Sequence, residues 1–169
     1  LKDQSNLYDR GANDPIKNMH DSKFNQKYKI FNDQMYKDMI IISENLNFRE
    51  IRNIYSITDC YVSPYKAEGF NLTPLEAAAC GTQIVVTDGG PTDDYFNDCM
   101  GFKIESKEKI LNNNVLLSPK IDSLIEILKS IINKSDNKKE ARSKLVRENF
   151  SWENVVKKLK KEFENKLSK

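Results

Sequence analysis

Two short apolar runs in the middle of the chain are separated by one short helix of small residues. "CYVSPY" at 60–65 is typical of a buried strand that Pro64 ends, and "QIVVT" at 83–87 is typical of a second one. Between them, "LEAAAC" at 75–80 has the small side chains of a closely packed helix, which Gly81 ends. Since parallel neighbours need a crossover connection, usually a helix, this order predicts a pair of parallel strands.

The same alternation continues on both sides of this unit. We expect further strands at 39–43 ("MIIIS"), 101–104 ("GFKI") and 114–118 ("NVLLS"). The expected helices cover 25–38, 48–58, a stretch from Ser118-Pro119 to residue 132, a stretch after the polar break at 133–141, and the C-terminal segment from Ser151. Strands that alternate with helices predict an α/β fold with a mostly parallel sheet.

Length and composition limit the class of protein. With 169 residues the chain is long enough for one domain with a core and too short for two ordinary ones, so we expect a single domain over 1–169 with its C-terminal helix at 150–169. The formal net charge of +2 gives no reason to expect a nucleic-acid partner. No apolar run approaches the roughly 20 residues that span a bilayer.

Cysteine and histidine usage restricts the chemistry. The three cysteines, Cys60, Cys80 and Cys99, lack CxxC spacing and indicate reduced thiols in the cytoplasm. A single histidine, His20, in a polar stretch is too few for a zinc site or a histidine-dependent triad. The sequence therefore predicts no metal site.

A ligand site is predicted where the first strand of the central unit ends. In an open parallel sheet, ligands bind beyond the carboxyl ends of the strands. The loop there runs into a helix start at which Thr73 is the expected cap, Pro74 suits the first turn and Glu76 completes a capping box. Free amides and the positive end of the helix dipole suit a phosphate, and Gly69 allows its close approach. The Asp88-Gly89-Gly90 loop leaves the same edge.

Two glutamates, Glu68 and Glu76, flank this turn. A carboxylate beside a diphosphate is repelled unless it faces hydroxyls, for which its oxygens are acceptors. The pair therefore predicts a diphosphate with a polyol on either side, as in a nucleotide sugar. The structural alternatives are that Glu76 is the capping-box partner of Thr73 and that Glu68 is a solvated loop residue. A dinucleotide is less favoured because no GxGxxG follows a strand, and a P-loop is absent as well.

The stretch "EGFNLTPLEAAACGTQIVVTDGGPTDD" resembles the donor-binding signature of the retaining family-4 glycosyltransferases of the GT-B fold. "REIRNIYSITDCYVSPY" and "FSWENVVKKL" are similar to flanking segments of that family, so the resemblance covers about residues 39–165. It implies a Rossmann-like three-layer domain, the C-terminal, donor-binding half of such an enzyme. The N-terminal acceptor domain of the same protein would then be a partner missing from this chain.

The resemblance also implies roles for residues. Glu68 would contact donor-sugar hydroxyls near the anomeric carbon; it has been considered as a nucleophile, although a front-face route without a covalent intermediate is the commoner view. Glu76 would hold the ribose hydroxyls, and the base would lie at Ser43-Glu44-Asn45. The sugar and the diphosphate would meet the two glycine-containing loops, at Gly69, Phe70, Asn71, Leu72, Thr73, Gly89 and Gly90.

The implied reaction is transfer of a sugar from an α-linked nucleotide donor with retention of configuration. It needs neither metal nor other cofactor, because positive side chains and helix dipoles stabilise the leaving diphosphate. Asn71 departs from the pattern, since glycine is common there, and Thr73-Pro74 displaces the usual proline by one position. The family's phosphate-binding Arg and Lys precede the region where the chain begins, and no counterpart is found here. The resemblance also implies that the reaction takes place in the cleft between two domains, so the isolated domain is expected to be inactive or nearly so.

Two other classes stay open: a non-catalytic nucleotide-sugar-binding or interaction module, and a GT-B relative such as a nucleotide-sugar epimerase. The C-terminal helix also offers a possible peripheral contact with an anionic membrane, although a solvated face is the favoured interpretation. Its lysines are Lys157, Lys158, Lys160 and Lys161, and its apolar side is Val155, Val156, Leu159, Phe163 and Leu167.

Overall fold

The computed structural model describes residues 38, 40, 42, 45–111, 114–132 and 134–167. The chain divides into two compact units, Leu1–Asn47 and Phe48–Lys169, and the elements below belong to the second. The helix expected over 25–38, the strand expected at 39–43 and His20 lie outside the described residues, apart from the isolated positions just named.

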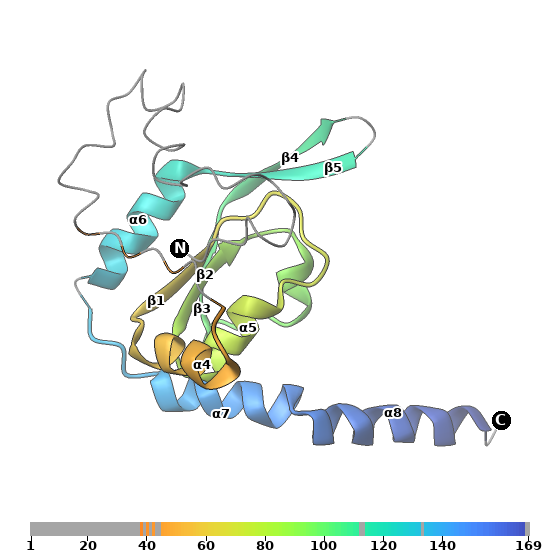
Figure 1. The fold of residues 1–169 in the computed structure, drawn as a ribbon. Coiled ribbons are helices and arrows are strands. Elements are labelled where there is room, and N and C mark those ends of the chain that lie inside the picture. Colours follow the sequence, from red (N-terminus) through yellow and green to blue (C-terminus); the bar gives the residue numbers. More distant parts are fainter. Residues whose placement is uncertain are drawn as a thin grey trace. The chain divides into compact units, whose positions relative to one another are not determined.

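The helices begin and end close to their predicted positions (Figure 1). They are α4 (Phe48–Ile57), α5 (Leu72–Ala79), α6 (Ile121–Ile132), α7 (Lys139–Phe150) and α8 (Trp152–Leu167), with a 3-10 turn, η2, at Pro91–Asp94. The predicted start of the last helix at Ser151 is confirmed, because the Ser151 hydroxyl accepts a hydrogen bond from the Asn154 amide (3.3 Å).

Three of the strands form a parallel sheet, which confirms the α/β prediction. β1 (Cys60–Ser63), β2 (Gln83–Thr87) and β3 (Gly101–Ile104) lie in the order β1-β2-β3. Cys60 is paired with Gln83, and Ile84 with Gly101. α5 is the crossover between β1 and β2, as the short helix of small residues predicted.

One strand was not predicted. β4 (Ser106–Leu111) pairs with β5 (Asn114–Pro119) in an antiparallel hairpin, so the 114–118 segment joins this second sheet instead of the parallel one. "SKEKIL" carries no apolar alternation because nearly all of β4 is exposed on both faces. The hairpin is nevertheless tied to the domain, since the Leu117 amide donates to the Lys66 carbonyl (2.7 Å).

The core lies between the parallel sheet and α5. The β2 side chains Ile84, Val85 and Val86 are fully buried. On α5, Ala77 and Ala78 are also fully buried, and their small side chains let the helix pack closely on β1 and β2. α7 covers α5 in turn.

The turn from α5 into β2 confirms that Gly81 ends the helix. Gly81 has a φ of 88°, a left-handed conformation that favours glycine. The Gly81 amide donates to the Ala78 carbonyl (2.9 Å) and the Thr82 amide to the Ala77 carbonyl (3.0 Å), so the last helical carbonyls are satisfied.

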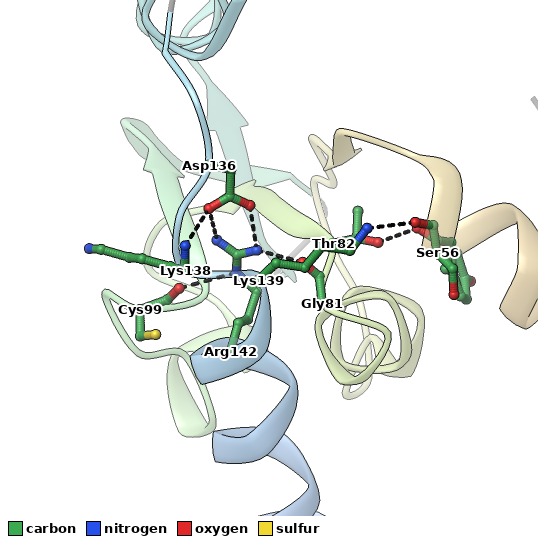
Figure 2. A network of polar contacts seen from close by, with 9 residues as sticks. Ser56, Gly81, Thr82, Cys99, Asp136, Lys138, Lys139 and Arg142 are labelled. Carbon is green, nitrogen blue, oxygen red and sulfur yellow. Dashed lines mark hydrogen bonds and ion pairs between the residues drawn. The ribbon is translucent and has the colours of Figure 1, made fainter.

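A buried arginine that the sequence did not single out holds α7 to the sheet (Figure 2). Arg142 is 0% exposed, and its guanidinium forms an ion pair with Asp136 (2.8 Å). Its Nη1 also donates to the Gly81 carbonyl (2.6 Å) and its Nε to the Cys99 carbonyl (3.1 Å). The segments before β2, before β3 and before α7 are thus joined through one side chain.

α8 leaves most of its apolar side accessible. Leu159 is 53% exposed and Phe163 is 65% exposed. In the described part of the chain, no helix combines the length and apolar character that crossing a bilayer requires.

Candidate active site

The predicted ligand edge is formed by the carboxyl ends of the parallel strands. β1 ends at Ser63 and β2 at Thr87, in a parallel pair whose register aligns Ser63 with Val86. The loop from Pro64 to Asn71 and the loop from Asp88 to Gly90 therefore leave the same edge of the sheet.

The prediction that Thr73 caps the helix is wrong. α5 begins at Leu72, and the cap position is Asn71, whose side chain makes no capping hydrogen bond. The Thr73 hydroxyl instead accepts a hydrogen bond from the Tyr61 hydroxyl (2.9 Å) and donates to Asn71 Oδ1 (3.3 Å). Tyr61 on β1 and the cap residue Asn71 therefore engage the Thr73 hydroxyl in place of a capping box, which also removes the structural alternative for Glu76.

Asn71 is the most constrained residue of this turn. It is the one described residue other than glycine with a positive φ, 61°. Its side-chain Nδ2 donates to Ser63 Oγ (3.0 Å), and its backbone carbonyl accepts a hydrogen bond from the Tyr95 hydroxyl (2.7 Å). The side chain that replaces the common glycine is therefore directed to the end of β1.

Backbone donors are available at the start of α5. Leu72 and Thr73 occupy the first turn, where amides have no intrahelical acceptor, and Pro74 contributes no donor. No described residue accepts a hydrogen bond from the amides of Gly69 or Phe70. A Cβ built on Gly69 would meet nothing within 4 Å, so its surroundings are open.

The structure places the two glutamates on either side of this turn. Glu68 is exposed in the loop before α5, and Glu76 lies in the second turn of the helix with its residue surface largely accessible. No described residue forms an ion pair or hydrogen bond with either carboxylate. Partial burial raises the pKa of Glu76 above its ordinary value.

Each glutamate lies near a different tyrosine. Burial, together with the charges of Tyr61 and Glu76, raises the pKa of Tyr55 on α4. Burial, together with Tyr65, Tyr61 and Glu68, raises the pKa of Tyr95. Both phenols therefore remain protonated at physiological pH, and the Tyr95 hydroxyl donates a hydrogen bond to the Asn71 carbonyl.

A buried polar network joins the loop after β1 to the loop after β2. The Tyr65 hydroxyl donates to the Thr87 carbonyl (3.1 Å) and contacts the Thr92 hydroxyl (2.7 Å), while Thr87 Oγ1 donates to the Tyr65 carbonyl (2.8 Å). A Cβ on Gly90 would overlap the buried Tyr65 hydroxyl, so only glycine fits there. The two loops form one packed unit.

The second loop also contains charged side chains. The Gly89 amide donates to Asp93 Oδ2 (3.1 Å), so this predicted donor contact is engaged within the loop. Lys103 on β3 forms ion pairs with Asp93 (2.8 Å) and Asp88 (3.1 Å). This lysine offsets two carboxylates that would otherwise repel an anionic ligand.

Sequence reasoning missed the residues that hold these loops: Tyr61, Ser63, Tyr65, Tyr95 and Lys103. They come from three different strands or their connections, and none belongs to a short motif. The feature of the sequence that could have indicated them is the presence of three tyrosines, Tyr61, Tyr65 and Tyr95, around the predicted ligand edge. The predicted base site at Ser43-Glu44-Asn45 lies outside the described residues except for Asn45.

A cavity of about 560 Å³ lies at the opposite, amino edge of the sheet. It is lined by Cys60 at the start of β1, Gln83 at the start of β2 and Ile131 of α6. Burial raises the pKa of the Cys60 thiol to about 11, so this thiol is a poor nucleophile. Because parallel sheets bind ligands at their carboxyl edge, we do not assign the donor to this cavity.

Comparison with known proteins gives the family. The chain matches Glycosyl transferases group 1 over residues 21–152, well over half of its length. It is also similar to the lipopolysaccharide core biosynthesis mannosyltransferase LpsB of Rhizobium meliloti (strain 1021), with 42% identity over 52 residues, which are 31% of this chain and 14% of that protein. The chain therefore belongs to the group 1 glycosyltransferases.

Proposed function

We propose that the described domain binds the nucleotide-sugar donor of a retaining hexosyltransferase of the GT-B fold. The observation that carries the proposal is the accessible N-terminus of α5 at the carboxyl edge of the sheet, with Glu68 before it and Glu76 after it. Neither carboxylate forms an ion pair or hydrogen bond with another described residue, and partial burial raises the pKa of Glu76. A carboxylate with a perturbed pKa beside a predicted ligand edge is a candidate for a functional site.

In this proposal the donor lies across the start of α5. The diphosphate accepts hydrogen bonds from the free amides around Leu72 and gains from the positive end of the helix dipole. Glu76 accepts hydrogen bonds from the ribose hydroxyls, and Glu68 from the hydroxyls of the transferred sugar. The leaving diphosphate is stabilised by fixed dipoles, without a metal or another cofactor.

The reaction we propose is transfer of a hexose to an acceptor with retention at the anomeric carbon. The mannosyltransferase name of the bacterial relative supports a hexose donor, although the match spans only 14% of that protein. We further propose that turnover needs a second, acceptor-binding domain, so that this chain alone binds the donor and transfers little or nothing.

Calorimetry on the 169-residue chain tests the assignment. We expect Glu76→Ala to weaken binding of the nucleoside diphosphate about tenfold to a hundredfold, since a charge-assisted hydrogen bond is worth about 1.5–3 kcal/mol. Glu68→Ala should leave that affinity nearly unchanged and instead reduce the preference for the sugar nucleotide over the free nucleotide. UDP, GDP and ADP, with their common sugar conjugates, are the ligands to screen.

Glu126→Ala is the matched control, because Glu126 is an exposed glutamate on α6, outside both glycine-containing loops and outside α5. It should bind all ligands as the wild type does. Wild-type affinities for both site variants would contradict the assignment of the two glutamates.

A further inference from the structure

We propose that Tyr95 is a positioning residue for the diphosphate: its hydroxyl fixes the peptide between Asn71 and Leu72 so that the Leu72 amide faces the ligand. The inference rests on the proposed function and adds to it a residue outside the two glycine-containing loops.

The Tyr95 hydroxyl has little freedom to move. The residue is 4% exposed, and its ring packs against Phe70 (5.3 Å between centroids) and Phe150 (6.3 Å). Its backbone amide donates to the Thr92 carbonyl (3.2 Å). From this fixed position the hydroxyl donates to the Asn71 carbonyl (2.7 Å).

The peptide that accepts this bond carries one of the proposed phosphate donors. No cis peptide is present among the described residues, and in a planar trans peptide the carbonyl and the following amide point in opposite directions. Holding the Asn71 carbonyl against Tyr95 therefore directs the Leu72 N–H away from Tyr95. Because Leu72 is the first residue of α5, this N–H has no intrahelical acceptor.

The turn needs such an anchor. A residue other than glycine in the left-handed region is disfavoured by roughly 1–2 kcal/mol, so the peptide would tend to rotate out of this orientation. The bond from Tyr95 and the bond from Asn71 Nδ2 to Ser63 oppose that rotation from the backbone and from the side chain. Burial raises the pKa of Tyr95, so the hydroxyl remains a donor throughout the physiological range.

Tyr95 also connects the two loops. It immediately follows η2, which itself begins directly after Gly89-Gly90. Through its hydroxyl, Tyr95 therefore couples the position of the Gly89-Gly90 loop to the position of the turn at Asn71. A displacement of the one loop should then displace the other.

Tyr95→Phe tests the inference, since it keeps the ring and removes only the hydroxyl. Inorganic pyrophosphate is the probe, because it carries the diphosphate without a base, and binding is followed in the 169-residue chain by calorimetry and by amide NMR. We expect its affinity to fall about threefold to tenfold, the factor that one hydrogen bond is worth. The Leu72 amide signal should shift even without ligand, and the affinity for the matching nucleoside should not change.

The matched control is Thr82→Val, which removes another buried hydroxyl, one that donates to the Tyr55 carbonyl at the amino edge of the sheet. It should lower thermal stability and leave pyrophosphate binding unchanged. Equal pyrophosphate affinity in Tyr95→Phe and wild type, or an equal loss for pyrophosphate and nucleoside, would overturn the positioning role. If the wild type binds neither pyrophosphate nor any nucleoside diphosphate, the proposed function fails, whereas an unmoved Leu72 signal refutes the Tyr95 geometry alone.

Discussion

At the scale of single residues, Asn71 shows how the site is built. Its φ of 61° requires a left-handed backbone at the point where β1's loop turns into α5. Among residues other than glycine, asparagine visits this region most readily because its short polar side chain can hydrogen-bond nearby. Here that side chain reaches Ser63 Oγ. Asparagine thus keeps the turn that glycine commonly forms and adds a bond to the strand.

Comparison of Asn71→Gly with Asn71→Ala should separate these two contributions. Both variants lose the bond to Ser63, which is worth about 1 kcal/mol. Only alanine also meets the steric cost of the left-handed region, roughly 1–2 kcal/mol. In urea denaturation we expect Asn71→Ala to be less stable than Asn71→Gly by at least about 1 kcal/mol. Equal stabilities would show that the backbone of this residue is not constrained.

Glu76 links stability to function through its pKa. Partial burial raises the pKa of Glu76 above 4.5 in the folded state. At a pH above this raised pKa the ionised carboxylate therefore lowers the free energy of unfolding. At a pH below the pKa of the unfolded chain, the carboxyl is protonated in both states and this destabilisation is absent. Glu76→Gln should therefore be more stable than wild type at neutral pH, and the difference should vanish as the pH falls to about 4.

The affinity for the nucleotide should depend on pH in the opposite way to stability: it should be highest where Glu76 is ionised. The wild-type affinity is expected to fall in mild acid, because a protonated Glu76 carboxyl has lost one hydrogen-bond acceptor. Since the pKa of Glu76 is raised, this fall should begin at a higher pH than for a glutamate with an ordinary pKa. Glu76→Gln should bind weakly at every pH. Thermal unfolding and calorimetry across a pH series measure both effects, with Glu126→Gln as the control; a wild type whose affinity is constant over that range would contradict the role of Glu76.

At the scale of elements, the loops of the site are braced by segments outside the central unit. The hairpin of β4 and β5 contacts both loops, since the Leu117 amide donates to Lys66 and the Ser106 hydroxyl donates to the Asp88 carbonyl (2.7 Å). At the other edge, Arg142 ties α7 to the turns that precede β2 and β3. The hairpin therefore supports the loops at the carboxyl edge of the sheet, whereas the buried Arg142 holds the turns at the amino edge.

Removal of the Arg142 side chain should strongly destabilise the fold. Arg142→Ala leaves Asp136 without its partner and the Gly81 and Cys99 carbonyls without a donor, so we expect a loss of about 3–5 kcal/mol in the free energy of unfolding. Lys144→Ala is the control on the same helix, because its pair with Glu148 (3.8 Å) is exposed and should contribute less than about 1 kcal/mol. A loss of similar size in both variants would contradict the structural role of Arg142.

Asp136 gives this pair a pH dependence. The hydrogen bond from Arg142 holds the pKa of Asp136 below its ordinary value of 3.8, against the opposing effect of burial. The stabilisation is thus present above that ordinary value and is lost as the pH falls through the lowered pKa. In Asp136→Asn, the free energy of unfolding should therefore fall less steeply as the pH is lowered below 3.8.

At the scale of the whole molecule, the order of strands and helices was predictable because it follows from buried periodicity. β2 was predicted at its observed bounds, since a strand buried on both faces is marked by a nearly continuous apolar run, here Ile84-Val85-Val86. β4 was missed for the converse reason: its side chains face solvent, so no pattern marks it. The site edge was predictable as well, because parallel strands bring their carboxyl ends together.

The local chemistry of the site was predicted less well. The capping box at Thr73 satisfied every local rule, yet Tyr61 and Ser63 bind Thr73 and Asn71 in its place. Likewise, nothing near Arg142 in the chain indicates that its partners are carbonyls at residues 81 and 99. Whether the two glutamates contact a donor stays a prediction.

The amino-acid sequence alone therefore established the parallel α/β unit, the Gly81 stop and the sheet edge from which the two glycine-containing loops leave, since each depends on contacts between residues near in the chain or on the period of burial. The αL cap at Asn71, the tyrosines that hold it and the buried Arg142 were decided by tertiary structure. The bonds from Asn71 to Ser63, from Tyr95 to Asn71 and from Arg142 to Gly81 join residues 8, 24 and 61 positions apart along the chain. A hydrogen bond at such a separation exists only once the backbone has brought both groups together.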